Sequence, residues 1–214
     1  MTLEAQLHAR WRALVPTAVA LGGDLISRYA DPSRHYHTLE HLRAVLDGVD
    51  RLQAEAADVY LVELAAWFHD AVYDAHRDDN EDQSALLAES KLTSTGLDRA
   101  AVAEVARLVR MTARHDPTPG DANAAVLSDA DLAVLASEPE AYDAYADAVR
   151  REYAHVSDAG WRAGRATVLT QLIGLGRLFH TSLGRSEWER PARTNLSREL
   201  SRLRAVSEEP APPR

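Results

Sequence analysis

Hydrophobic residues recur at intervals of three and four along almost the whole chain, which is the spacing of amphipathic helices. The pattern is clearest in residues 38–53 and is repeated in residues 58–72. The apolar positions are Leu39, Leu42, Val45, Leu46, Val49 and Leu52 in the first segment, and Leu61, Val62, Leu64, Ala65, Phe68 and Val72 in the second. Thr38 and Asp58 precede them and are suitable N-cap residues, so a helix is predicted in each segment.

The same periodicity predicts helices through most of the remaining chain. These further segments are residues 3–14, 17–29, 80–92, 98–113, 122–135, 139–154, 158–180 and 187–205. No segment shows the sustained alternation of apolar and polar residues that indicates strands. No long linker divides the chain either. We therefore predict one all-α, single-domain helical bundle over residues 1–206, with about eight to ten helices, and a disordered tail over residues 207–214.

The composition of the chain argues against several classes of protein, among them membrane-spanning, disulfide-bonded and nucleic-acid-binding proteins. Hydrophobic residues make up 46% of the chain and charged residues 27%, as is usual for soluble globular proteins. No apolar run approaches the roughly 20 residues that span a bilayer, and the first residues lack an apolar signal core. We therefore expect a cytoplasmic protein without a membrane partner. The net charge of −9 argues against an extended nucleic-acid surface, and the absence of cysteine excludes disulfides and thiolate metal sites.

Four of the nine histidines lie in two short segments, RHYHTLEHL at 34–42 and WFHDAVYD at 67–74. His37 and His41 are four residues apart, which places them on one face of a helix. His69 and Asp70 follow an apolar stretch that we expect to be buried, and a buried His–Asp pair is costly without a compensating charge. A divalent cation would account for these residues. The alternative is that these histidines and carboxylates form structural hydrogen bonds with one another and hold no metal.

The segment HTLEH at 37–41 also matches the H-x-x-E-H pattern of inverted zinc metallopeptidases. In that interpretation His37 and His41 are zinc ligands and Glu40 is the general base. A pattern with three fixed positions arises easily by chance, and this one leaves the His–Asp pair at 69–70 unexplained. A metallopeptidase is therefore the third and most distant hypothesis.

The order of the motifs resembles the HD superfamily of metal-dependent phosphohydrolases, whose pattern is H…HD…D on consecutive helices of an all-α bundle. Here His41 is followed by HD at 69–70 and by LSDADLAVL at 127–135. YHTLEH is also similar to the Y-H-N-x-x-H segment of cyclic-nucleotide phosphodiesterases, which belong to this superfamily. More closely, the chain resembles a bacterial family of predicted HD-superfamily phosphohydrolases, over about residues 34 to 200. The shared segments are RHYHTLEHL, AAWFHDAVYD, DNEDQSA, SDADLAVLA, YADAVRREY and ARTNLSREL.

The resemblance implies a set of four metal ligands: His41, His69, Asp70 and Asp131. Asp129 competes with Asp131 for the last position, because both lie in the segment DAD. Asp131 is preferred because it matches the AD-x-L context of the last ligand in the superfamily. Asp129 is then a candidate to orient a ligand histidine, or it serves only as a helix cap.

The resemblance also implies roles for residues around these ligands. His37 corresponds to the proton donor of the phosphodiesterases. Asp74 matches the second acid of the HD-x-x-E-D motif of (p)ppGpp hydrolases, while Tyr73 replaces the first, so that substrate is not implied. Arg34 is a candidate phosphate ligand, with a surface salt bridge as the alternative. His115 is a candidate for a second metal or for phosphate, or a solvated loop residue.

The function implied is that of an enzyme, a metal-dependent phosphohydrolase acting on a nucleotide or another small phosphate ester through a metal-activated water. The mixed nitrogen and oxygen ligands suit Mn, Fe, Co, Ni, Zn or Mg and do not select among them. The alternative is a regulatory module that binds a metal or nucleotide without turnover, which the replacement at Tyr73 favours. The substrate, the number of metal ions and the formation of a homo-oligomer stay open.

Overall fold

The computed structural model describes residues 1–207, with side chains to residue 205. Within that range the secondary structure consists of ten α-helices with short 3₁₀ and π turns, and no strand occurs. The prediction of an all-α fold is confirmed. None of the described helices is long and apolar enough to cross a membrane. The tail predicted at 207–214 lies, from residue 208 on, outside the described residues.

The chain divides into two compact units, Met1–Asp131 and Leu132–Arg214. The division falls inside helix Ala122–Leu132. The sequence predicts a single domain over residues 1–206, and this stays a prediction. The two units are described separately. Every candidate site residue lies in the first unit.

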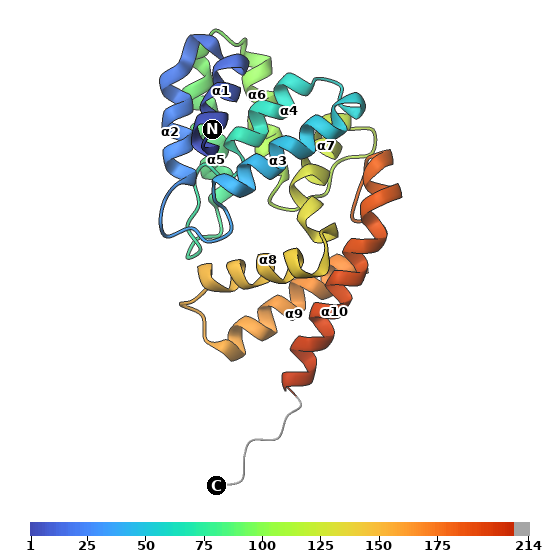
Figure 1. Ribbon diagram of the computed structural model, residues 1–214. Helices are drawn as coiled ribbons and strands as arrows, with labels where there is room; N and C mark the ends of the chain where they lie inside the picture. The colour runs from blue at the N-terminus through green and yellow to red at the C-terminus, as the bar shows by residue number, and fades with distance from the viewer. Residues whose placement is uncertain (208–214) are drawn as a thin grey trace. The chain divides into compact units, whose positions relative to one another are not determined.

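The first unit contains helices α1 to α7 (Figure 1). Their bounds are α1 Leu3–Leu14, α2 Val19–Tyr29, α3 Leu39–Leu52, α4 Val59–Phe68, α5 Asn80–Leu92, α6 Arg99–Met111 and α7 Ala122–Leu132, with 3₁₀ turns η1 Pro16–Ala18, η2 Gln53–Glu55 and η3 Thr93–Thr95. Helix α4 packs against both α3 and α6, α5 packs against α6, and α1 packs against α2. This arrangement makes α4 the central helix of the unit.

The composition of α4 explains its central position. Its residues from Leu64 to Phe68 are all fully buried, because a helix that is apolar around its circumference must be covered by neighbours. Trp11 of α1 meets Trp67 edge to face, with ring centroids 5.1 Å apart. Gly22 of α2 allows this packing, because a Cβ atom there would lie only 2.1 Å from the Trp11 ring. His69 and Asp70, which directly follow α4, are therefore buried as well.

Helix α4 ends at Phe68, earlier than the predicted residue 72, and His69 and Asp70 lie in a turn. Side chains bind the backbone groups that a longer helix would have satisfied. The Arg34 guanidinium donates to the carbonyl of Asp70 at 2.7 Å, and the Val72 N–H donates to Ser84 Oγ at 3.0 Å. The side chains of His69 and Asp70 both reach one site, with Asp70 Oδ2 3.1 Å from His69 Nε2.

The predicted caps differ in outcome. Asp58 caps α4, because its carboxylate accepts a hydrogen bond from the Leu61 N–H at 3.2 Å. Thr38 occupies the N-cap position of α3 but makes no side-chain cap bond. Its hydroxyl instead donates to the Glu40 carboxylate at 2.9 Å.

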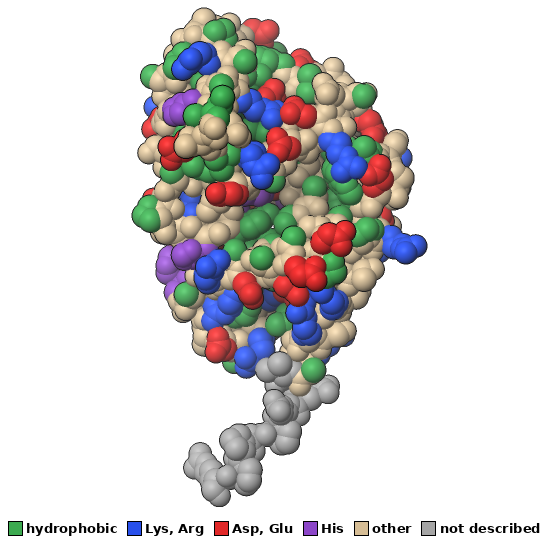
Figure 2. Space-filling view, in the orientation of Figure 1, with side chains coloured by type: hydrophobic (Ala, Val, Ile, Leu, Met, Phe, Trp, Pro, Cys, Tyr) green, Lys and Arg blue, Asp and Glu red, His purple; other side chains and the backbone are tan. Residues whose placement is uncertain are grey.

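The second unit contains a 3₁₀ turn, a π turn and three helices. They are η4 Ala133–Ala136, α8 Pro139–Glu152, α9 Asp158–Gly174, η5 Gly184–Trp188 and α10 Glu189–Ser207. Helix α9 ends at Gly174, six residues before the predicted end. Helix α10 packs against α9 and η4, and a buried pair of Arg165 and Glu199, 2.8 Å apart, joins α9 to α10. On the face of the molecule drawn in Figure 2, acidic and basic side chains are interspersed.

Candidate metal centre

Three helices of the first unit bring histidines and carboxylates to one point. His41 lies in the first turn of α3, His69 and Asp70 follow the end of α4, and Asp131 lies near the end of α7. His41, His69 and Asp131 form a group whose potential ligand atoms all lie within 4.8 Å of one another. These three residues could hold a metal ion.

The distances within the group suit one cation. Nε2 of His41 lies 3.0 Å from Nε2 of His69, and metal–nitrogen bonds of about 2.1 Å at right angles would separate two ligands by about 3.0 Å. Asp131 Oδ1 lies 3.3 Å from the His41 nitrogen and 3.7 Å from the His69 nitrogen. Asp70 lies outside the group of three, yet its Oδ2 is 3.3 Å and 3.1 Å from the same nitrogens. The atoms of all four predicted ligands therefore converge.

The orientation of His69 prepares it for coordination. Its Nδ1 lies 2.7 Å from the carbonyl oxygen of Ala66. A carbonyl only accepts hydrogen bonds, so Nδ1 carries the proton and donates it. In neutral His69 the lone pair is therefore on Nε2, the atom that faces His41 and the carboxylates. A hydrogen bond at the second ring nitrogen is the usual means of orienting a ligand histidine.

Burial and charge act in opposite directions on the acid–base properties of the ligands. Burial lowers the pKa of His69, but the carboxylates of Asp70 and Asp131 outweigh it and raise that pKa to about 9. Burial raises the pKa of Asp131, but the imidazoles of His69 and His41 outweigh it and lower that pKa to about 2. The pKa of Asp70 is likewise held well below its usual value by the histidines, despite burial. Without metal, the cluster therefore retains a proton on its histidines at neutral pH.

This proton predicts how stability depends on pH. The raised pKa of His69 stabilises the metal-free protein below pH 6.5, and that stabilisation is lost as the pH rises through about 9. We expect the free energy of unfolding of the metal-free protein to fall over this window by at most about 3 kcal/mol. Metal-saturated protein should show no such fall, because the metal takes the place of the proton. Urea unfolding at pH 6.5 and 9, with and without metal, measures the effect, and metal-free protein that gains stability would contradict it.

The structure distinguishes the two aspartates of the DAD segment. Asp131 faces the histidines, whereas Asp129 is fully buried and lies outside the group of potential ligands. His115 contacts the second oxygen of Asp131, with Nε2 3.4 Å from Oδ2, and its Nδ1 lies 3.2 Å from Ser128 Oγ. Its backbone has a φ of 49°, a left-handed conformation that costs about 1 kcal/mol or more for a non-glycine residue. His115 is therefore held at the edge of the cluster.

His37 lies just outside the ligands. Its Nε2 is 4.0 Å from Asp70 Oδ2, and its ring stacks on that of Tyr73 with centroids 4.1 Å apart. Tyr73 is the residue that stands in place of the first acid of the HD-x-x-E-D motif. His37 is half-buried, as a group that exchanges protons with a bound molecule would be.

Arg34 is buried and bound to the backbone of the turn. Its guanidinium donates to the carbonyls of Asp70 at 2.7 Å, His37 at 3.1 Å and Ala71 at 3.3 Å. It also lies over the rings of Tyr29 and Tyr73. These contacts hold the His–Asp turn in place. A role in binding phosphate stays a prediction, and it would need some of these donors to be shared.

The structure does not join Asp74 to the ligands. Its side chain is exposed, and Oδ1 accepts a hydrogen bond from the His76 N–H at 2.9 Å. Asn80 holds its backbone, bonding both the N–H and the carbonyl at 3.0 Å. Asp74 thus stabilises a turn, and its predicted role on the water stays a prediction. Glu40 is also exposed and hydrogen-bonded to Thr38.

Sequence reasoning missed one carboxylate whose charge interacts with the cluster, Glu81. Glu81, in the first turn of α5, is half-buried and interacts electrostatically with Asp70, His37 and Asp131. Burial raises its pKa, and the two aspartates raise it further. Glu81 lies in the shared segment DNEDQSA. Several acidic residues lie near one another there, and the sequence does not show which of them faces the cluster.

Comparisons of the chain with sequence families, with curated proteins and with solved structures find no match. The resemblance to the HD superfamily therefore rests on the order of the motifs. The geometry adds a buried His–His–Asp group that could hold a metal ion.

Proposed function

We propose that the chain is a metal-dependent phosphohydrolase of the HD type, acting on a small phosphate ester. The observation that carries the proposal is the convergence of His41, His69, Asp70 and Asp131 from three helices, with two imidazole nitrogens 3.0 Å apart. These four residues come in the order of the superfamily pattern. The convergence supports one cation site, while the order of the motifs supports the type of chemistry.

The donor atoms fit a divalent cation. Two imidazoles and two carboxylates supply the nitrogen and oxygen ligands that Mn²⁺, Fe²⁺, Co²⁺, Ni²⁺ and Zn²⁺ accept. Mg²⁺ is a weaker fit, because it prefers oxygen ligands. Such an ion, when bound, supplies an acidified water and polarises a phosphoryl oxygen. His41, His69, Asp70 and Asp131 would hold it.

The chain's own residues would then manage protons and position. Glu81, a half-buried carboxylate that interacts electrostatically with Asp70 and Asp131, is suited to accept a proton, because burial raises its pKa. His37, when protonated, is suited to donate one to a leaving oxygen. Arg34 holds the turn that carries His69 and Asp70. In this proposal Glu81 takes the role that the motif assigned to Asp74.

Metal analysis and a substrate screen test the proposal. We expect the purified protein to carry a divalent transition metal in near-stoichiometric amount and to hydrolyse p-nitrophenyl phosphate and phosphorylated metabolites. Chelation should abolish turnover, and the same metal should restore it. A His8→Ala variant is a matched control, because His8 is an exposed histidine of α1 and should leave both properties unchanged. Purified protein that binds no divalent metal would refute the proposal.

A regulatory module is the alternative, and two observations favour it. Asp74 Oδ1 accepts a hydrogen bond from the His76 N–H, and Tyr73 occupies the position of the other acid. A module of this kind would bind a metal and phosphorylated metabolites, yet hydrolyse none of them. Metal-loaded protein that binds members of the screen without turnover would establish this second function.

A further inference from the structure

We infer that Tyr29, the last residue of α2, is a positioning residue of the metal centre, because its hydroxyl ends helix α4 in a way that orients His69. The hydroxyl replaces the Ala66 carbonyl as the acceptor for the Asp70 N–H, and leaves that carbonyl to the ligand histidine. This role rests on the proposed function and goes beyond it, because it adds a residue outside the ligand group on which metal binding depends.

Two backbone groups at the end of α4 lack the partners that a continuous helix would provide. In such a helix the Asp70 N–H would donate to the Ala66 carbonyl, but that carbonyl accepts a hydrogen bond from His69 Nδ1 at 2.7 Å. The Ala71 N–H would likewise donate to the Trp67 carbonyl, but it donates to the carbonyl one residue later, at 3.0 Å. The Asp70 N–H and the Trp67 carbonyl therefore need other partners, since a buried backbone group without one is costly.

One buried hydroxyl satisfies both groups. Tyr29 Oη accepts a hydrogen bond from the Asp70 N–H at 3.2 Å and donates one to the Trp67 carbonyl at 3.4 Å. A phenol does both at once while it keeps its proton. Burial, with the charge of Asp70 adding to it, holds the pKa of Tyr29 well above its usual value, so the proton stays. Arg34 lies over the Tyr29 ring and donates to the Asp70 carbonyl, so the Asp70 backbone is held at both its N–H and its carbonyl.

This exchange of partners fixes the ligand histidine. The Ala66 carbonyl lies within reach of two donors, the Asp70 N–H and His69 Nδ1. Because Tyr29 accepts from the first, the carbonyl is available to the second. A hydrogen bond at Nδ1 orients the ring and leaves Nε2 for the metal. Tyr29 thus acts on the metal through the backbone of the turn.

Tyr29→Phe tests this role, because it removes the hydroxyl and keeps the ring. Without the hydroxyl, the Asp70 N–H competes for the Ala66 carbonyl and His69 loses its fixed orientation. We expect the variant to bind Co²⁺ about tenfold more weakly than the parent, at the lower end of the usual effect of such outer hydrogen bonds. The visible absorption spectrum of bound Co²⁺ should also change, because it reports the geometry of the ligands. A variant with the parent's Co²⁺ affinity and spectrum overturns the inference.

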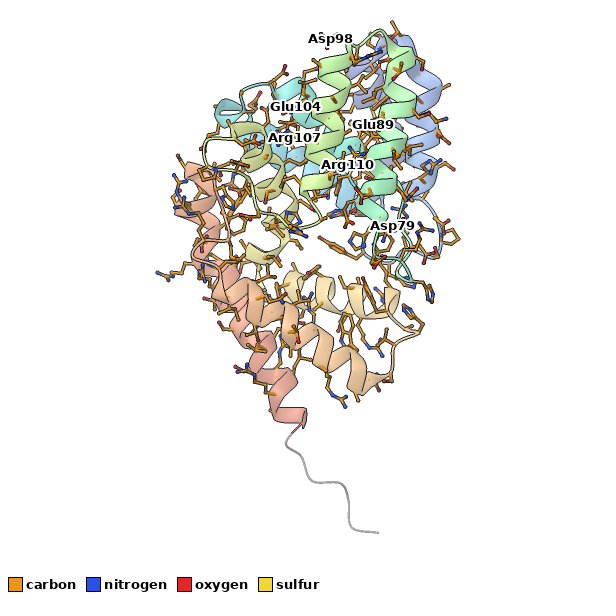
Figure 3. All side chains as sticks on the ribbon, turned by 180° about the vertical axis from the view of Figure 1, so that it is seen from behind. Asp79, Glu89, Asp98, Glu104, Arg107 and Arg110 are labelled. Carbon is orange, nitrogen blue, oxygen red and sulfur yellow. The ribbon has the colours of Figure 1, made fainter. Side chains whose placement is uncertain are left out.

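Two further variants control for a general loss of stability. Tyr142 is also fully buried, and its hydroxyl donates to Glu199 at 2.5 Å in the second unit, so Tyr142→Phe removes a comparable hydrogen bond. Arg110→Ala breaks the 2.9 Å ion pair with Glu89 that joins α6 to α5 in the first unit (Figure 3). Both variants should keep the parent's Co²⁺ affinity and spectrum. An equal loss of affinity in the controls would show that Tyr29 contributes only to folding, and it would overturn the inference.

Nitrogen-15 NMR of the metal-free protein tests the same arrangement without a metal. In the parent, the Nδ1 proton of His69 should exchange slowly with water, because it is buried and bound to the Ala66 carbonyl. In Tyr29→Phe it should exchange about tenfold faster, as expected when a buried hydrogen bond is lost. Rapid exchange in the parent overturns the inference, even if the variant does not fold. A parent protein that binds no Co²⁺ is a different outcome, because it refutes the proposed function while the NMR result still decides the role of the hydroxyl.

Discussion

His69→Ala is expected to abolish metal binding and phosphoesterase activity together. Nε2 of His69 lies 3.0 Å from Nε2 of His41 and 3.1 Å from Asp70 Oδ2, so the variant loses one of two nitrogen ligands. It also removes one of the two imidazoles that lie between the carboxylates of Asp70 and Asp131. Metal content after dialysis and hydrolysis of p-nitrophenyl phosphate measure the two losses.

His37→Ala provides the contrast. Its Nε2 lies 4.0 Å from the nearest ligand oxygen, so the variant should keep the metal. It should lose about 10²- to 10⁴-fold in turnover of esters with a poor leaving group, because a proton donor is missing. Esters of p-nitrophenol need little protonation and should be affected less.

The same variants separate a phosphohydrolase from a metallopeptidase. In the peptidase interpretation His37 and His41 both bind the metal, Glu40 is the base, and His69 is dispensable. Glu40 is exposed and bonded to Thr38, so we expect Glu40→Gln to stay largely active. A metal-free His37→Ala protein together with a metal-bound His69→Ala protein would support the peptidase instead.

Asp131→Ala is expected to release the metal, whereas Asp129→Ala should weaken metal binding by only about 10- to 100-fold. Asp131 Oδ1 lies 3.3 Å from the ligand nitrogen of His41. Asp129 is fully buried outside the ligand group and acts through its neighbours. The metal dissociation constants of both variants, measured by competition with a chelating dye, test this difference.

The burial of Asp129 calls for a second variant. Alanine at a fully buried aspartate also lowers stability, so Asp129→Asn, which keeps the shape, controls for misfolding. The thermal unfolding midpoint of each variant, recorded with and without metal, separates a loss of folding from a loss of metal. If Asp129→Asn strips the metal and Asp131→Asn does not, the assignment within the DAD segment is reversed.

The local sequence was sufficient for the helices. The three- and four-residue spacing of Leu42, Val45, Leu46 and Val49 reports which side of one helix is buried, and burial along a single element depends on that element's own residues. Asp58 as a cap was predictable for the same reason, because the carboxylate bonds an amide three residues away. The lack of a cap bond from Thr38 was not predictable, because its hydroxyl donates to the nearby Glu40 carboxylate.

The convergence of the candidate ligands could be proposed from motif order, but only tertiary contacts decided how the site is built. The spacing of residues 58–72 favoured a helix through Asp70, yet Arg34 and Ser84 bind the backbone there and turn it. Arg34, the predicted phosphate ligand, donates to the carbonyls of Asp70 and Ala71, more than 30 residues along the chain, and its role with phosphate stays a prediction.

The two acids show the same limit. Asp74 matched a motif but accepts a hydrogen bond from a local amide, while Glu81, which received no role from the sequence, interacts electrostatically with Asp70 and Asp131. Periodicity reports which face of one element is buried. It does not report which of several nearby carboxylates faces another element, because that depends on atoms brought together from distant parts of the chain.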